Sequence, residues 1–332
     1  MRRFKLFLLS CCLATITARA DVYTALAFDN QVRVFADDAA ENDPPLRVIE
    51  GPATLLNAPA GVAIDLAADE LFVSNVGDDS VLVYPLDADG DTAPLRVLAG
   101  SETGFRSPIG MIVDSINDEL YVFDRLGRDV KVFPRDASGN VGPLRSIGGP
   151  NLNLIFPRFG FLDLTADELY VLDQGSGVET VYVFHRTASG DARPLRSITG
   201  DNTEMSEPAD LFLNRNAEEL YVLQNDSRAV TVYEARAEGN VAPLRTIVGP
   251  ATGLLNPASL LVTEDDQLIV TNRDFGYRIF PAGASGDVSP IVTINQGKGS
   301  AIASTRALEG SAGFAVIEQL LFTSSFETLG DR

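Results

Sequence analysis

The triplet Pro-Leu-Arg recurs along this chain at an almost constant spacing. Five copies occur in 332 residues, each 49 or 51 residues after the one before it, and a degenerate sixth begins at Pro290. A period of this length is typical of arrays in which each unit buries its apolar faces against its neighbours. The repeat therefore predicts six similar units that fill the chain. The complete copies begin at Pro45, Pro94, Pro143, Pro194 and Pro243.

Each unit contains four short apolar segments divided by Gly, Asp, Asn or Pro. In the second unit they span residues 61–65, 71–75, 81–84 and 95–98. Their β-branched and aromatic residues alternate with a period of two, which is typical of strands. An Ala-x-Gly-Asp/Asn turn, in which glycine supplies the positive φ, separates the third and fourth segments. We predict an all-β fold, a six-bladed β-propeller of four-stranded antiparallel blades, with the proline of each triplet opening the edge strand.

The first unit begins at its second strand, and surplus chain follows the sixth unit. We expect residues 313–317 to supply the missing strand and to close the ring, with residues 300–304 as the alternative closing strand and a linear array as the alternative architecture. The propeller then covers residues 21–323 and leaves a C-terminal tail at 324–332. The segment Phe322–Glu327 resembles a short F-x-D-G-F-E segment that ends some exported proteins of Gram-negative bacteria.

The first twenty residues have the composition of a secretory leader. A basic start precedes an apolar stretch over residues 6–17, and Ala18-Arg19-Ala20 forms a small-residue cleavage site. This pattern predicts a signal peptide over residues 1–20 and export to the periplasm or the medium. The alternative is a lipid anchor at Cys11. Both cysteines lie in this segment, so the predicted mature chain has no disulfide.

The chain is strongly acidic, with a formal net charge of −20. A negative field repels phosphate backbones and anionic lipids, which argues against nucleic acid or a membrane surface as the partner. No apolar stretch has the roughly 20 residues that a membrane-spanning helix needs. We interpret the charge as that of a soluble exported surface; the alternative is attraction of cations, including Ca²⁺.

Three short patterns recur within the units: G-x-A-x-D, then [DE]-L-[YF]-V-x-[DN], then V-x-V-[YF]. Together they resemble the NHL-type repeat of six-bladed propellers over roughly residues 21–320. The absence of tryptophan from the sequence separates the chain from WD40 and Kelch repeats. The resemblance implies the fold. It leaves the activity open, because related propellers include calcium-dependent gluconolactonases, zinc-containing amidating lyases and binding scaffolds.

Oxygen-bearing side chains stand at the predicted end of the second strand in every unit. The loops at these strand ends are expected to share a face with the loops that precede the inner strands. The side chains could converge on one hard cation such as Ca²⁺, with Asp124, Asp173, Asn75 and Asn272 as its ligands. Alternatively, each caps a turn of its own blade, and its recurrence in every unit favours capping. The six are Asp29, Asn75, Asp124, Asp173, Gln224 and Asn272.

The loops that follow the fourth strands differ most between units. They place Phe105 and Arg106 before the third unit, and Ile155 and Phe156 before the fourth. Variable loops on a repeated scaffold are where specificity is usually carried, so we expect these residues at the rim of a binding face. The alternative is that Ile155 and Phe156 fill the axial channel.

Few residues are available for catalysis. The single histidine, His185, is predicted to lie far from the axis, and no G-x-S-x-G occurs, which argues against zinc-lyase and serine-hydrolase chemistry. We interpret the acidic pairs that precede four of the second strands, such as Asp118-Glu119, as solvated turn features. The Asp-rich segment at 87–91 departs from an EF-hand loop and is interpreted as a hairpin turn.

We therefore predict a non-catalytic binding module for a protein, glycan or small molecule, with no cofactor. The alternative is a calcium-dependent, lactonase-like hydrolase with an axial metal ion. Glu50-Gly51-Pro52 resembles the E-G-P start of those enzymes. However, Gly-Pro recurs at residues 149–150 and 249–250, which indicates a turn instead.

Overall fold

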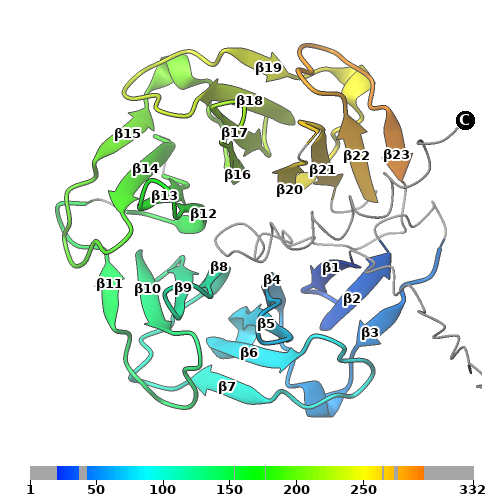
Figure 1. Ribbon diagram of the computed structural model, residues 1–332, viewed down its shortest axis with the longest axis vertical. Coiled ribbons are helices and arrows are strands. Elements are labelled where there is room, and N and C mark those ends of the chain that lie inside the picture. The colour runs from blue at the N-terminus through cyan, green and yellow to red at the C-terminus, as the bar shows by residue number, and fades with distance from the viewer. Residues whose placement is uncertain are drawn as a thin grey trace, which may run out of the picture.

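The computed structural model describes residues 21–36, 43–152, 154–175, 177–263, 265–272 and 276–294. Within these ranges six antiparallel sheets stand around one axis, as the blades of a propeller (Figure 1). Five sheets have four strands and the first has three. The predicted six-bladed β-propeller is thus confirmed. The predicted leader at 1–20, the tail at 324–332 and both candidates for the closing strand, at 313–317 and 300–304, lie outside the described residues.

Each complete blade runs outward from the axis in sequence order (Figure 1). The inner strands are β4 (Pro59–Asp65), β8 (Pro108–Asp114), β12 (Pro157–Asp163), β16 (Pro208–Asn214) and β20 (Pro257–Val262). The second strands are β1 (Asp21–Leu26), β5 (Glu70–Asn75), β9 (Glu119–Asp124), β13 (Glu168–Asp173), β17 (Glu219–Gln224) and β21 (Leu268–Asn272). The third strands are β2 (Gln31–Ala36), β6 (Ser80–Pro85), β10 (Asp129–Pro134), β14 (Thr180–His185), β18 (Ala229–Glu234) and β22 (Gly276–Phe280).

The outermost strands are the shortest. They are β3 (Arg47–Ile49), β7 (Arg96–Ala99), β11 (Arg145–Ile147), β15 (Arg196–Thr199), β19 (Arg245–Ile247) and β23 (Val292–Ile294). Each begins at the arginine, or the equivalent residue, of its triplet, so the proline precedes the strand and does not open it. The helices in the described ranges are the short 3₁₀ turns η1 (Pro52–Thr54), η2 (Val76–Asp78), η3 (Asp201–Thr203) and η4 (Pro250–Thr252). Among these residues no helix is long and apolar enough to cross a membrane.

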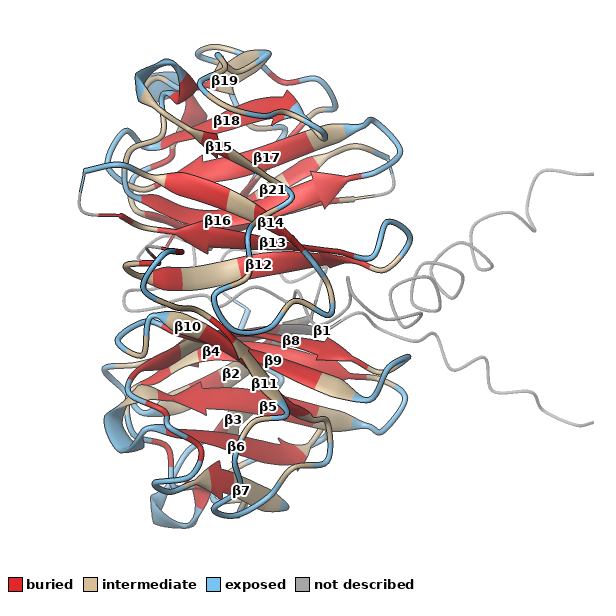
Figure 2. Cartoon of the chain, turned by 90° about the vertical axis from the view of Figure 1, so that its left-hand side faces the viewer, coloured by how far each residue is buried: buried red, intermediate tan, exposed pale blue. Residues whose placement is uncertain are grey.

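In blades two to five both faces are buried, because each of these blades packs between two others. Along β9, Leu120 and Val122 join the core shared with blade two, whereas Tyr121 and Phe123 join the core shared with blade four. This is the alternation that a strand imposes on successive side chains. Figure 2 shows the result, with buried sheets and exposed connecting loops. The near-continuous apolar composition of the second strands follows from burial on both faces.

The recurrent Ala-x-Gly-Asp/Asn turn joins neighbouring blades. In blade two, the N–H of Gly90 donates to the carbonyl of Val48 at 2.8 Å, and Gly90 accepts from the N–H of Glu50 at 3.0 Å. Its φ is +61°. Asp91 then accepts a hydrogen bond from the N–H of Ala53 at 2.6 Å. The edge of the outer strand in blades one to five is therefore covered by the next blade, and five such bridges recur: Ile49 with Gly90, Leu98 with Gly139, Ile147 with Gly190, Ile198 with Gly239, and Ile247 with Gly286.

Replacing Asp91 with alanine should lower the free energy of unfolding by about 1 kcal/mol, the usual cost of removing a side-chain cap. The N–H of Ala53 would lose its acceptor, and blades one and two would lose one of their links. Urea denaturation of the propeller would measure the change. Asp87→Ala is the matched control, because Asp87 is exposed in the same turn. Equal destabilisation by the two substitutions would contradict the capping role.

The triplet arginine holds a glutamate of its own blade. In blade four, Arg196 lies 2.6 and 2.7 Å from the two carboxylate oxygens of Glu168, and its guanidinium lies 5.4 Å from the centre of the Tyr170 ring. The interpretation of the acidic pairs as solvated is wrong for their second residue, since Glu168 is only 8% exposed. The same clamp joins Glu70 to Arg96, Glu119 to Arg145, and Glu219 to Arg245.

Candidate functional site

The oxygen donors at the ends of the second strands cap loops of their own blades. Asp173 accepts hydrogen bonds from the N–H groups of Ile155 at 3.0 Å and Phe156 at 2.7 Å, in the loop that precedes inner strand β12. The amide oxygen of Asn272 accepts from the N–H of Leu255 at 3.0 Å. These contacts favour the capping interpretation. The same arrangement is made by Asn75, Asp124 and Gln224.

A shared metal site at these side chains is not evident from their positions. Within the described ranges, no three His, Cys, Asp or Glu side chains are grouped so that they could hold a metal ion. The oxygens of Asp124 and Asp173 already accept several backbone hydrogen bonds each. A divalent ion at either residue would therefore have to replace these bonds.

Asp29 does not occupy the equivalent position in blade one. Strand β1 ends at Leu26, which pairs with Gln31 as Asn75 pairs with Ser80. Asp29 lies beyond this point, in an exposed turn 3.5 Å from Arg33. The assignment of Asp29 to the strand end is therefore wrong, because the turn after β1 begins earlier than the sequence pattern indicates. In the part of blade one that the structure describes, no inner strand precedes β1, and apolar Leu26 replaces the capping donor.

In blade three the capping side chain belongs to a buried charged network. Asp124 is fully buried and accepts hydrogen bonds from the N–H groups of Ser107 at 2.8 Å and Gly127 at 3.3 Å. It also accepts from the Lys131 ammonium at 2.9 Å, which contacts Asp129 as well. Burial raises the pKa of Asp129, and the charge of Lys131 opposes that rise. Asp124 therefore ties the loop before β8 to the loop after β9.

The sequence-based reasoning missed Lys131, although a signal was present. It is the only lysine between residues 21 and 294, and it stands in the middle of a V-x-V-F strand. The valines on either side of it are fully buried. A charged residue at such a position requires a buried partner, which Asp124 at the end of the neighbouring strand supplies.

Beside this network the loops line an open pocket of about 700 Å³. We call it the mouth pocket; it is lined by Asp79, Phe105, Arg106, Leu126, Gly127, Arg128 and Phe156. Three of the four rim residues expected from the sequence are thus brought together. Ile155 is half-buried beside Phe156 but is not among the lining residues.

Two aromatic rings form the apolar part of the mouth pocket. Phe105 is almost buried and packs against Phe133, with ring centres 5.2 Å apart. Phe156 is half-buried, and the Arg125 guanidinium lies 5.0 Å from the centre of its ring. This contact between a cation and an aromatic face helps to hold the Phe156 ring at the edge of the mouth pocket.

The polar part of the mouth pocket is dominated by arginine. Arg106 and Arg128 are exposed, and within the described part of the chain neither lies within 4.0 Å of a carboxylate. Asp79 is the one acidic residue in the lining. Burial and the charge of Asp124 raise the pKa of Asp79, and the charge of Arg106 acts to lower it. The lining holds no serine, cysteine, histidine or lysine.

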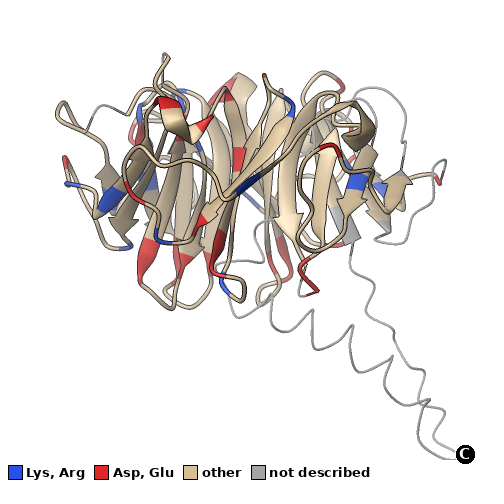
Figure 3. Cartoon of the chain, turned by 90° about the horizontal axis from the view of Figure 1, so that it is seen from above, with Lys and Arg blue, Asp and Glu red and all other residues tan. Residues whose placement is uncertain are grey.

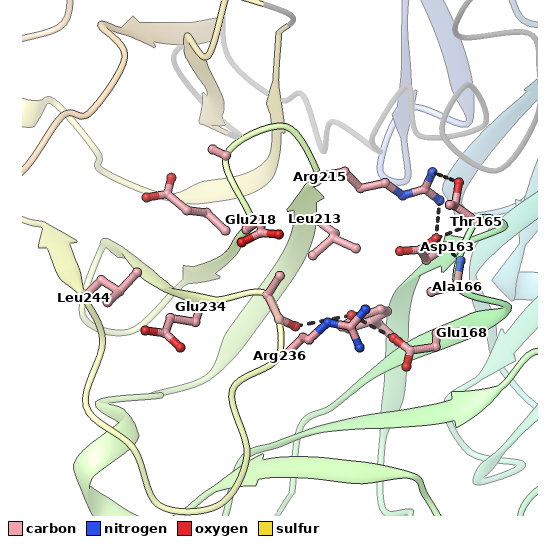
Figure 4. A pocket seen from close by; sticks show the side chains of 14 residues that line it. Asp163, Thr165, Ala166, Glu168, Leu213, Arg215, Glu218, Glu234, Arg236 and Leu244 are labelled. Atoms are coloured by element: carbon pink, nitrogen blue, oxygen red, sulfur yellow. Dashed lines mark hydrogen bonds and ion pairs between the residues drawn. The ribbon is translucent and has the colours of Figure 1, made fainter.

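A second pocket, of about 550 Å³, lies between blades four and five (Figure 4). Ala235 stands where blades three and four have Arg135 and Arg186, which contact carboxylates of the preceding blade. The shorter side chain leaves space, but three of the five carboxylates around it are held by arginines: Asp163, Glu168 and Glu219. Asp163 lies 2.5 Å from Arg215, and Glu168 is held by the Arg196 clamp. We therefore regard this pocket as a packing gap between blades.

Comparisons with known proteins identify the architecture. No protein-family model matches the chain, and no curated protein matches it in sequence. Among solved structures, a chain of the nidogen/laminin complex superimposes with a TM-score of 0.60 at 14% identity, over 83% of this chain and 93% of that one.

Three similar structures carry lactonase names, two of them from Bacteroides species. A putative 6-phosphogluconolactonase from Bacteroides fragilis has a TM-score of 0.55 at 15% identity, over 81% of this chain and 80% of that one. The periplasmic gluconolactonase of Pseudomonas aeruginosa has a TM-score of 0.54 at 17% identity, over 79% and 78%. At these identities the likeness is one of fold alone. The chain is a β-propeller, and its activity has to be argued from its own residues.

Proposed function

We propose that this protein is an exported, non-catalytic propeller that binds a ligand at the mouth pocket. The observation that carries the proposal is that the residues which cap the loops recur from blade to blade, whereas the residues which the loops expose do not. The capping donors below the loops recur in five blades, whereas the residue at the position of Arg106 changes in every blade. Its counterparts are Asn57, Ile155, Ser206 and Leu255. A repeated scaffold with variable loops is the arrangement in which repeat proteins carry specificity.

The composition of the chain supports this proposal. The leader-like residues 1–20 support export, and the NHL-type resemblance supports a fold that is common among binding scaffolds. The mouth pocket places a few charged groups beside the apolar surfaces of Phe156 and Leu126, and convergent polar groups of this kind fix the orientation of a ligand. The nidogen/laminin complex shows that a propeller of similar fold can take part in a complex with another protein. A small molecule, a glycan or a protein segment is therefore a candidate ligand.

Removing the ring of Phe156 should weaken ligand binding roughly tenfold, because the ligand would lose an apolar surface. Affinity would be measured by titrating the protein with a library of small organic fragments and monitoring the amide chemical shifts of the protein. We expect shifts at Arg106, Leu126 and Gly127, and their loss in Phe156→Ala. Phe28→Ala is the control, since Phe28 is 95% exposed on blade one, outside the mouth pocket. Fragments that bind elsewhere, or that bind Phe156→Ala equally well, would overturn the proposal.

A second candidate function is a metal-dependent lactonase. Three similar structures carry lactonase names, and Asn75, Asp124, Asp173 and Asn272 are the residues that we would assign to a Ca²⁺ ion. A bound ion would polarise the lactone carbonyl and activate water. Hydrolysis of gluconolactone that depends on Ca²⁺ and is lost in Asp173→Ala, together with a melting temperature raised by Ca²⁺, would favour this function. If a chelator changes neither the activity nor the melting temperature, the lactonase function is excluded and the binding function remains.

A further inference from the structure

The mouth pocket is positively charged on a protein that is otherwise negative. The whole chain has a formal net charge of −20, and acidic residues occupy both faces of the disc (Figure 3). The lining of the mouth pocket nevertheless contains two arginines and a single aspartate. A third arginine, Arg125, stacks on Phe156 at its edge. An anion approaching this protein would be repelled by most of the surface and attracted here.

The arginines of the mouth pocket differ from those of the Pro-Leu-Arg triplets. Each triplet arginine of blades two to five is committed to a glutamate of its own blade. Arg106 and Arg128 have no such carboxylate within 4.0 Å among the residues that the structure describes. Their backbones, in contrast, are held in place: the N–H of Arg106 donates to Asp124 at 3.0 Å, and that of Arg128 donates to the Asp124 carbonyl at 2.9 Å. Two guanidiniums on fixed loops thus face one pocket.

We propose that the ligand of the mouth pocket is an organic anion, with a carboxylate next to an aromatic or other flat apolar group. This inference rests on the proposed binding function. A guanidinium presents paired N–H donors that match the two oxygens of a carboxylate. The ring of Phe156 and the side chain of Leu126, with the exposed edge of Phe105, supply the surface on which the apolar group packs.

The negative charge of Asp79 opposes the positive charge of the arginines, so removing it should change anion binding in the opposite direction to removing an arginine. As the one acidic group in the lining, it reduces the attraction for an anion. Replacing it with asparagine should therefore strengthen binding of a carboxylate. The substitution suits the backbone, because Asp79 has a φ of +46° and Asn30, in the corresponding turn of blade one, has a φ of +52°.

Three probes with the same phenyl ring and chain would test the proposal: 3-phenylpropionate, its neutral amide and the corresponding amine. Dissociation constants would be measured from amide chemical shifts of the mouth pocket. We expect the carboxylate to bind about tenfold more tightly than the amide, the factor that a charge-assisted hydrogen bond of ~1.5 kcal/mol gives. Arg106→Gln should remove most of this preference, and Asp79→Asn should enlarge it. Raising the ionic strength should weaken the carboxylate alone.

Arg228→Gln is the matched control. Arg228 occupies the turn position of Arg128 in blade five, with a φ of +52°, and lies outside the mouth pocket. It should leave all three dissociation constants unchanged. If the amide or the amine binds in the mouth pocket as tightly as the carboxylate, the anionic ligand class is overturned while the binding function stands. If neither the probes nor the fragment library shifts any amide of the mouth pocket, both proposals fall.

Discussion

Replacing Asp124 with alanine is expected to lower the free energy of unfolding by about 3 kcal/mol. The substitution leaves the Lys131 ammonium, 5% exposed, with Asp129 as its remaining partner, and removing one partner of a buried ion pair typically costs this much. It also removes the acceptor of the Ser107 and Arg106 N–H groups. Urea denaturation followed by circular dichroism would measure the loss.

Blade two provides the control for this experiment. Its residues Asn75, Ser80 and Leu82 occupy the positions of Asp124, Asp129 and Lys131. The triple substitution D124N/D129S/K131L therefore keeps an oxygen to accept the loop N–H groups and leaves no buried charge. We expect it to recover most of the stability lost in Asp124→Ala. If the triple variant is as unstable as Asp124→Ala, the buried network is not what stabilises this corner of blade three.

The same residue connects stability to the proposed site. The Asp124 carboxylate bonds to the loop that carries Phe105 and Arg106 and to the loop that carries Leu126 and Gly127. Asp124 is therefore a positioning residue for the mouth pocket. Its loss should weaken binding of the fragments even where the folded state remains populated.

The fold was predictable because its determinants are local and repeated. The triplet spacing gives six units, and the alternation in segments such as V-x-V-[YF] gives strands. The glycine of each Ala-x-Gly-Asp/Asn turn has the positive φ that the sequence pattern predicts. Blade one was the exception. Its register could not be read from the pattern, because Leu26 stands where the other blades have an oxygen donor and Asp29 lies in the turn beyond it.

The contacts that join residues distant in sequence were not predictable in the same way. The clamp between Glu168 and Arg196 joins the second and fourth strands of one blade, and the bridge between Ile49 and Gly90 joins two blades. The clamp recurs in blades two to five and the bridge at five blade junctions, so the repetition indicated that the residues are structural without showing their partners. The mouth pocket combines Asp79, Phe105 and residues near 126 and 156, and this convergence appears only when the loops are placed in space.

The glutamate–arginine clamps should make the protein sensitive to acid. Hydrogen bonds from Arg196 hold the pKa of Glu168 below its ordinary value, and Arg245 does the same for Glu219. Burial alone would raise the pKa of Glu119, but hydrogen bonds from Arg145 and Tyr121 outweigh it and the pKa is lowered. A carboxyl whose pKa is lowered by folding stabilises the folded state above its unfolded pKa, near 4.5, and loses that contribution as the pH falls through its folded pKa.

Glu168→Gln should therefore lower the free energy of unfolding at pH 7 by about 1.5–3 kcal/mol, the range for a hydrogen bond to a charged group. The same substitution should cost progressively less below pH 4.5, where the wild-type carboxylate itself becomes protonated. Burial raises the pKa of Asp129, so protonation of this residue stabilises the folded state as the pH falls. Asp129 is present in both proteins and therefore does not change the difference in stability between wild type and Glu168→Gln.

The measurement is urea denaturation of both proteins at a series of pH values. Glu218→Gln is the control, since Glu218 is the exposed neighbour of clamped Glu219. A difference between wild type and Glu168→Gln that stays constant from pH 7 to pH 3 would show that the Glu168 charge does not stabilise the blade.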